Sequence, residues 1–233
     1  MTIKRQTLAY TAGGDELKGY LAFDDESEGA RPGVMVIHEW WGLDDYIRTR
    51  TDKLAELGYT ALAIDMYGNG ANADSPDEAG GMMNAVLGNM EIGTSRLRAA
   101  HDVLCAQTVV DKTRTAAIGY CFGGAMVLHM ARIGMPLKAV VSFHGSLGSF
   151  HTPTPREIQS RILICHGAND SSFQKVILKL SMRRWRLLKR ASNSNPTRER
   201  YTGLLIQTLR NAGKTTAYPW LMNNTPMKRH GLR

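Results

Sequence analysis

The residues best suited to chemistry in this 233-residue sequence lie in one hexapeptide, Gly119-Tyr120-Cys121-Phe122-Gly123-Gly124. A cysteine with glycines two positions before and two positions after it matches the G-x-nucleophile-x-G pattern of a sharp strand-to-helix turn. Such a turn leaves no room for side chains at the two glycines, and it places the cysteine at a helix N-terminus. There the helix dipole and free backbone N–H groups favour a thiolate and a developing oxyanion. The alternative is a glycine-rich turn that contains a buried structural cysteine.

The hexapeptide needs a strand before it and a helix after it, and the surrounding sequence predicts both. Short apolar runs rich in Val and Ile predict strands at residues 33–38, 60–64, 113–120, 137–143 and 161–165. Apolar residues spaced by three and four predict helices at residues 45–57, 93–109 and 123–133, whereas residues 71–81 are predicted to be a loop. Strands that alternate with helices indicate an α/β fold with a mostly parallel central sheet flanked by helices.

Five segments, in this order and spacing, resemble the dienelactone hydrolase family over about residues 10–173. They are Val36-Ile37-His38-Glu39-Trp40-Trp41-Gly42-Leu43, Ala63-Ile64-Asp65-Met66-Tyr67-Gly68, Ile118-Gly119-Tyr120-Cys121-Phe122-Gly123-Gly124, Ser142-Phe143-His144-Gly145 and Ile164-Cys165-His166-Gly167-Ala168-Asn169-Asp170. The resemblance implies an α/β-hydrolase fold. It also implies hydrolysis of dienelactones and related small esters or lactones by a Cys-His-Asp triad, through an acyl-enzyme and without a cofactor.

Five positions carry functional expectations from this resemblance. Cys121 matches the family nucleophile, and Asp170 matches the acid of the triad. Glu39 matches the glutamate that contacts the resting thiol until substrate displaces it. The backbone N–H groups of Phe122 and Trp40 match the oxyanion hole, since one donor follows the nucleophile and the other follows an earlier strand. The alternatives are a turn-forming aspartate at Asp170 and a solvated loop charge at Glu39.

The other cysteines and histidines have less specific interpretations. Cys105 falls in a predicted helix and Cys165 in a predicted strand, so both are expected to be small buried hydrophobic residues. Neither a disulfide framework nor a metal site is expected, because the spacing fits neither. Trp40 and Trp41 are expected to line the substrate pocket. The histidines are interpreted as strand-end or helical background: His38, His144, His166, His101 and His129.

The sequence departs from the family where the triad histidine is expected. In the family this histidine follows the acid by about 30 residues, in a segment like Y-G-x-x-H-S-F. Residues 200–208 contain no histidine, and His230 is the only one after His166. A cysteine without its general base loses most of its activation, so the activity of this chain is expected to be impaired.

Charge divides the sequence into a core at residues 1–173 and a tail at residues 174–233. The core has 15 Lys and Arg against 20 Asp and Glu, whereas the tail has 14 against one. We hypothesise that this basic tail is translated out of frame and is poorly ordered. Read from the third base of each codon, residues 216–231 can encode a sequence resembling the family's late segment. In the same frame residues 201–207 can encode Tyr-Gly-Ala-Val-His-Ser, which restores the histidine across the codons of Leu205 and Ile206.

These observations favour a hydrolase whose partner is a small-molecule ester or lactone. The alternative is a catalytically inactive hydrolase-like protein whose basic tail binds nucleic acid or anionic surfaces. A third possibility is a poorly stable, non-functional product. The sequence has no run of 18 apolar residues, and residues 1–10 lack the apolar segment of a signal peptide. A cytoplasmic location without membrane attachment is therefore expected.

Overall fold

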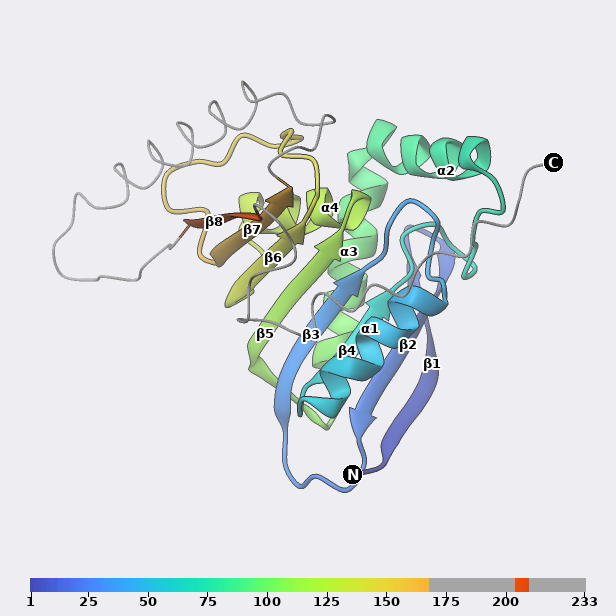
Figure 1. Ribbon diagram of the computed structural model, residues 1–233, viewed down its shortest axis with the longest axis vertical. Coiled ribbons are helices and arrows are strands. Elements are labelled where there is room, and N and C mark those ends of the chain that lie inside the picture. The colour runs from blue at the N-terminus through green and yellow to red at the C-terminus, as the bar shows by residue number, and fades with distance from the viewer. Residues whose placement is uncertain (168–203, 210–233) are drawn as a thin grey trace, which may run out of the picture.

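A single mixed sheet organises the chain (Figure 1). The structure is a computed structural model that describes residues 1–167 and, as backbone, residues 204–209. The eight strands lie in the order β1-β2-β4-β3-β5-β6-β7-β8; the pairs β1–β2 and β2–β4 are antiparallel and all later neighbours are parallel. The elements are β1 (Ile3–Ala12), β2 (Asp15–Asp24), β3 (Arg31–Ile37), α1 (Asp45–Glu56), β4 (Thr60–Ile64), α2 (Pro76–Gly88), α3 (Met90–Cys105), β5 (Val110–Tyr120), α4 (Phe122–Arg132), β6 (Ala139–Phe143), β7 (Arg161–Gly167) and β8 (Leu204–Leu209).

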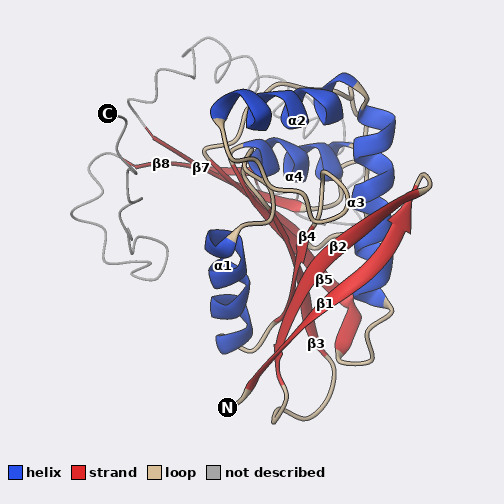
Figure 2. Ribbon diagram, turned by 90° about the vertical axis from the view of Figure 1, so that its right-hand side faces the viewer, coloured by secondary structure: helices blue, strands red, loops and turns tan. Residues whose placement is uncertain are grey.

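Helices cover both faces of this sheet, with α1 on one face and α2, α3 and α4 on the other (Figure 2). The alternation of side chains along each strand divides the core accordingly. In β3, Val34 and Val36 pack with residues of α1, whereas Met35 and Ile37 pack with residues of α3 and α4. All four side chains are at most 5% exposed, which explains why this strand is a continuous apolar run. The predicted α/β class with a mostly parallel sheet is confirmed.

The N-terminal hairpin and helix α2 differ from the sequence-based expectation. Strands β1 and β2 pair from Ile3 with Asp24 to Ala12 with Asp15, and no strand was predicted there. Helix α2 begins at Pro76, within the segment predicted to be a loop, so that prediction is wrong over residues 76–81. The Ser75 side chain caps the helix by accepting from the Glu78 N–H at 3.2 Å, and this local signal outweighs the two glycines that follow.

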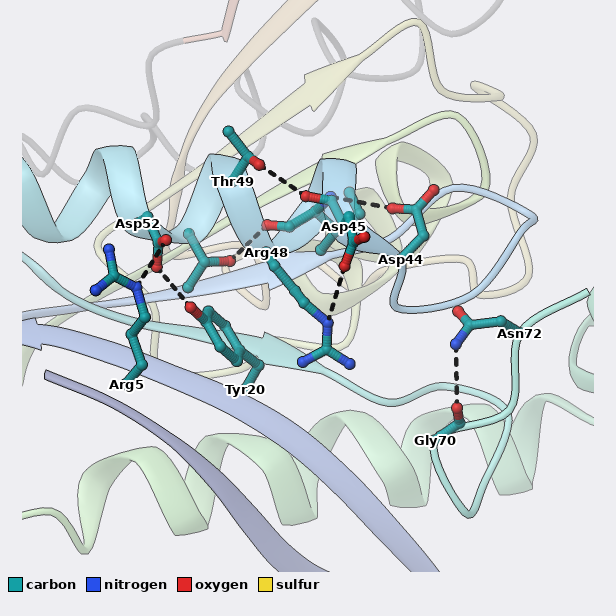
Figure 3. A network of polar contacts seen from close by, with 11 residues as sticks. Arg5, Tyr20, Asp44, Asp45, Arg48, Thr49, Asp52, Gly70 and Asn72 are labelled. Carbon is teal, nitrogen blue, oxygen red and sulfur yellow. Dashed lines mark hydrogen bonds and ion pairs between the residues drawn. The ribbon is translucent and has the colours of Figure 1, made fainter. Parts of the chain in front are cut away.

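Polar contacts fix α1 against the hairpin (Figure 3). Asp44 caps the helix, because its Oδ1 accepts from the Ile47 N–H at 3.0 Å. Asp52, on the side of the helix that faces β1 and β2, accepts from Arg5 Nε at 3.0 Å and from the Tyr20 hydroxyl at 2.8 Å. Helix α1 therefore has a fixed start and orientation, and the loop that precedes it runs directly from the end of β3.

The parallel strands β3, β5 and β6 all end at the same edge of the sheet. In parallel registration Ile37 of β3 lies opposite Gly119, and Tyr120 of β5 lies opposite Phe143 of β6. The residues that follow these three strand ends are therefore neighbours in space, although they are far apart in sequence.

Among the helices of the described part, none is long and apolar enough to cross a membrane.

Candidate active site

Cys121 occupies a strained turn between β5 and α4. Its φ of 51° and ψ of −111° lie outside the regions that residues with a side chain normally adopt. Such a conformation costs on the order of 1–3 kcal/mol and persists only where the surroundings enforce it. The Cys121 N–H donates to the Phe143 carbonyl at 3.0 Å, which ties the turn to β6. The side chain is partly exposed and stands at the N-terminus of α4 without capping it.

The two glycines of the pattern allow the turn to close. A Cβ at Gly119 would lie 2.1 Å from the Gly123 carbonyl oxygen. A Cβ at Gly123 would lie 2.3 Å from the Ile37 oxygen and 2.6 Å from the His38 oxygen. The Gly123 N–H donates to the same His38 oxygen at 3.0 Å. The beginning of α4 is therefore in direct backbone contact with the end of β3.

The loop after β3 is held by its carbonyl groups. Four successive carbonyl oxygens accept hydrogen bonds: one from α4, one from the His38 ring within the loop itself and two from the segment between β4 and α2. The donors are Gly123 N–H to His38 O at 3.0 Å, His38 Nδ1 to Glu39 O, Tyr67 hydroxyl to Trp40 O at 2.9 Å and Ala73 N–H to Trp41 O at 2.9 Å. This segment, residues 38–41, is called the oxyanion loop below.

Some N–H groups at this edge have no acceptor among the described residues, and two of them flank the turn at Cys121. One is the Trp40 N–H of the oxyanion loop, and the other is the Phe122 N–H in the first turn of α4. The first N–H groups of a helix have no partner within the helix, so the Phe122 N–H is available to a ligand oxygen, as is a loop N–H such as that of Trp40. N–H groups of this kind can stabilise negative charge on the oxygen of a ligand.

Glu39 lies across the end of β5 from His144. Its Oε1 is 3.4 Å from His144 Nε2, and since β5 lies between β3 and β6, this pair spans the strand that precedes Cys121. His144 has a φ of 43°, so a second residue at this edge is held in the left-handed region. Burial raises the pKa of the Glu39 carboxyl, the charge of Asp44 adds to the rise, and Arg50 opposes it.

Several aromatic side chains lie at this edge of the sheet. Trp40 and Trp41 meet edge to face with ring centres 5.1 Å apart, and Tyr120 stacks on Phe143 at 5.0 Å. Burial raises the pKa of the Tyr67 hydroxyl, and the charge of Cys121 contributes to the rise. Tyr67 is therefore close enough to the thiol to respond to its ionisation, and it stays protonated as the donor to Trp40.

Comparison with known proteins agrees with this geometry. The sequence model of the dienelactone hydrolase family matches residues 17–183. The chain belongs to this family. A curated relative from Aquifex aeolicus, named "Putative carboxymethylenebutenolidase", is 31% identical over 145 residues, covering 60% of the chain and 61% of the relative. The chain thus spans about three fifths of the length of the two curated relatives from Aquifex that it matches.

Two solved structures are similar to this family member in both fold and sequence. A protein named m3DLH is 35% identical with a TM-score of 0.80, and the match covers 91% of the chain and 83% of that protein. A dienelactone hydrolase-like promiscuous phosphotriesterase from metagenomic libraries is 34% identical with a TM-score of 0.76, covering 89% and 82%. The predicted α/β-hydrolase fold is thereby confirmed.

The structure brings together four of the five site residues predicted from the sequence. Cys121, Phe122, Glu39 and Trp40 meet at the ends of β3 and β5, whereas Asp170 lies outside the described residues, as do residues 200–203 and His230. Cys105 and Cys165 are free and partly exposed rather than fully buried. In the described part of the chain, no group of three or more His, Cys, Asp or Glu side chains is placed to hold a metal ion.

Two contributors to this edge were missed as background. His38 is buried at the base of the oxyanion loop, and His144 faces Glu39. Their positions directly after predicted strands were visible in the sequence. The sequence could not show that Met66, which comes 28 residues later, would donate its N–H to the His38 ring.

Proposed function

We propose that this chain is a hydrolase of small esters or lactones that uses Cys121 as its nucleophile. The observation that carries the proposal is the left-handed conformation of Cys121 between two glycines that have no room for a Cβ. Strain of this kind is maintained at functional sites, because it aims a reactive atom that an ordinary turn would leave buried. The names of relatives, carboxymethylenebutenolidase and dienelactone hydrolase, support the same class of substrate.

In the proposed acylation step, the thiolate Sγ of Cys121 forms a bond to the carbonyl carbon of the ester or lactone. The carbonyl π electrons move to the oxygen, which receives hydrogen bonds from the Phe122 and Trp40 N–H groups. Collapse of this intermediate breaks the bond to the leaving alkoxide and gives a thioester. By resemblance Glu39 contacts the resting thiol, and burial raises the pKa of its carboxyl; we propose that it accepts the thiol proton when substrate displaces it.

Release of the acid from the thioester requires a base that activates water. By resemblance, Asp170 would orient a triad histidine, but residues 200–208 contain none. We therefore propose that acylation by this chain is faster than deacylation, so that turnover is impaired. The out-of-frame tail remains the proposed cause, and sequencing the gene across codons 165–210 tests it: a sequence that cannot encode the family segments in the shifted frame rejects it.

The test of the nucleophile is intact-protein mass spectrometry after mixing with p-nitrophenyl acetate and with dienelactone. Wild-type protein should gain one acyl group per chain, with a burst of p-nitrophenol followed by slow turnover. Cys121→Ala should gain none. The matched controls are Cys105→Ala and Cys165→Ala, which remove the other two thiols. An undiminished burst in Cys121→Ala rejects the proposal.

The basic tail is the single observation that favours a second function, binding of nucleic acid or an anionic surface. Such binding would weaken steeply with salt, because each neutralised phosphate releases counterions. Fluorescence anisotropy with a duplex DNA at 50 and 200 mM salt tests it on the full chain. Binding that is absent at the lower salt concentration rejects this second candidate.

A further inference from the structure

His38 is a fully buried histidine whose two ring nitrogens both have backbone partners. The Met66 N–H approaches Nε2 at 3.2 Å, and because an N–H can only donate, Nε2 is the acceptor. The proton of the neutral ring therefore resides on Nδ1, which donates to the Glu39 carbonyl oxygen. The ring also meets Tyr67 edge to face, at 4.7 Å between ring centres, and contacts Phe122 at 5.8 Å.

The bond to Glu39 fixes more than a carbonyl group. The carbonyl of Glu39 and the N–H of Trp40 belong to one planar trans peptide unit, and in such a unit they point in opposite directions. Holding the carbonyl toward His38 therefore aims the Trp40 N–H away from His38. The next peptide unit joins the Trp40 carbonyl to the Trp41 N–H, and the Tyr67 hydroxyl holds it by donating to that carbonyl at 2.9 Å. The backbone is thus held on both sides of the Trp40 Cα, and Tyr67 helps to keep the Trp40 N–H in place.

The second oxyanion donor is tied to the same histidine. The His38 carbonyl accepts from the Gly123 N–H at 3.0 Å, one residue after the Phe122 N–H. His38 thus contacts both parts of the proposed oxyanion hole, through its ring on one side and through its carbonyl on the other. The segment that contacts the His38 ring, Met66 and Tyr67, is held in turn by Asp65, which accepts from the N–H groups of Tyr67 and Gly68 at 2.9 and 2.8 Å.

We propose that His38 and Tyr67 are positioning residues that aim the Trp40 N–H at the oxyanion formed during attack by Cys121. This inference rests on the proposed function, because it assumes that an oxyanion forms beside Cys121. It assigns His38 a role distinct from that of the triad histidine: the ring stays neutral, forms hydrogen bonds with backbone groups only, and transfers no proton. A purely structural role would instead make any apolar side chain of similar size an adequate replacement.

Two substitutions at His38 separate these roles. His38→Gln keeps a side-chain N–H donor for Glu39 and an oxygen that can accept from Met66, whereas His38→Leu keeps apolar bulk and loses both. Tyr67→Phe removes only the hydroxyl that holds the Trp40 carbonyl. The matched control is Tyr20→Phe, which removes a hydroxyl that donates to Asp52 on α1, away from the oxyanion loop (Figure 3).

The readout is reversible binding of an aryl trifluoromethyl ketone, which does not require turnover. The Cys121 sulfur adds to the ketone carbon, the π electrons move to the oxygen, and no group leaves, so the adduct places an oxyanion in the proposed hole. The rate of alkylation of Cys121 by iodoacetamide is measured in parallel. Alkylation depends on the thiolate but forms no oxyanion, so it reports the nucleophile alone.

We expect His38→Leu to bind the ketone roughly 10–100-fold more weakly than wild type, and Tyr67→Phe about 10-fold more weakly, since one misdirected donor loses part of its oxyanion stabilisation. His38→Gln and Tyr20→Phe should bind within about 3-fold of wild type, and all four variants should be alkylated at rates within about 3-fold. Equal ketone binding by His38→Leu and wild type overturns the inference, as does a His38→Gln variant that is as weak as His38→Leu. If His38→Leu fails to fold, ketone binding by Tyr67→Phe is compared with that by Tyr20→Phe, and equal binding by these two variants overturns the inference.

Failure of the proposed function has a different signature. In that case wild-type protein forms no ketone adduct at Cys121, and this result removes the inference together with its premise. If wild type forms the adduct and the two His38 variants are indistinguishable, the nucleophile stands and only the positioning role is rejected.

Discussion

Asp65→Asn tests the support beneath the oxyanion loop. The side chain is 1% exposed and accepts four backbone hydrogen bonds, two on each carboxylate oxygen. Oδ1 accepts from Tyr67 and Gly68 N–H at 2.9 and 2.8 Å, and Oδ2 accepts from Lys18 and Gly70 N–H at 3.0 and 2.7 Å. An asparagine presents an NH₂ group in place of one oxygen, so in either orientation two N–H donors face another donor.

The expected loss follows from this count. Each hydrogen bond to a charged acceptor contributes about 1.5–3 kcal/mol, so the loss of two lowers the free energy of unfolding by roughly 3–6 kcal/mol. With an m-value of about 3 kcal/mol/M, the urea midpoint should fall by roughly 1–2 M. Circular dichroism and tryptophan fluorescence should follow the same transition, because Trp40 and Trp41 lie in the loop that this region supports.

The matched control for this prediction is Asp102→Asn on α3. The Asp102 side chain is 83% exposed and lies 3.9 Å from His101 Nδ1, so its replacement should change the free energy of unfolding by about 0.5 kcal/mol or less. A midpoint for Asp65→Asn within error of this control would refute the reasoning that the four contacts hold the loop.

Two further predictions concern the turn and the acid beside it. Gly123→Ala should destabilise the protein by about 4 kcal/mol or more, because its Cβ would lie 2.3 Å from the Ile37 oxygen. In the control Gly80→Ala in α2, the new Cβ meets nothing within 4 Å, so the protein should be stabilised by up to about 1 kcal/mol. Urea midpoints measure both changes, and equal effects of the two substitutions would contradict the packing argument. The pKa of Glu39 is raised in the folded state, so its contribution to stability is present below its ordinary value of 4.5 and is lost as pH rises through the raised pKa. Glu39→Gln should therefore gain stability relative to wild type as pH rises above 4.5, and a difference that is constant from pH 4 to 8 would contradict this.

The sequence predicts the parts of this structure that depend on neighbouring residues. The turn at Cys121 follows from the positions of Gly119 and Gly123, and the buried strand β3 follows from a continuous apolar run. For helix α2, the sequence contains two local signals of a helix start, but the prediction gave more weight to the glycines that follow. Ser75-Pro76-Asp77-Glu78 is a helix start with a capping serine and a proline at the first position, but Gly80 and Gly81 favoured a loop.

The remaining parts depend on partners that are distant in the chain. The burial pattern of β1 alternates, but an alternating exposed hairpin resembles a polar N-terminal segment until its pairing with β4 through β2 is known. His38 illustrates the limit more sharply, because its neighbours in sequence suggest only the end of a strand. Its tautomer and its contacts depend on Met66, Tyr67 and Phe122, and these come together only when β3, β4 and β5 pair side by side.

The division of the site along the chain bears on what this chain can catalyse. The proposed nucleophile, both proposed oxyanion donors and Glu39 lie within residues 1–167, and contacts inside that range hold the backbone or side chains beside them. Asp170 and the segment in which the family has its histidine lie beyond residue 167. Attack on an ester requires a thiolate and an oxyanion hole, whereas hydrolysis of the thioester also requires an activated water. The two halves of the reaction therefore depend on different parts of the chain, and a sequence altered only after residue 173 should separate them, with acylation retained and deacylation slowed.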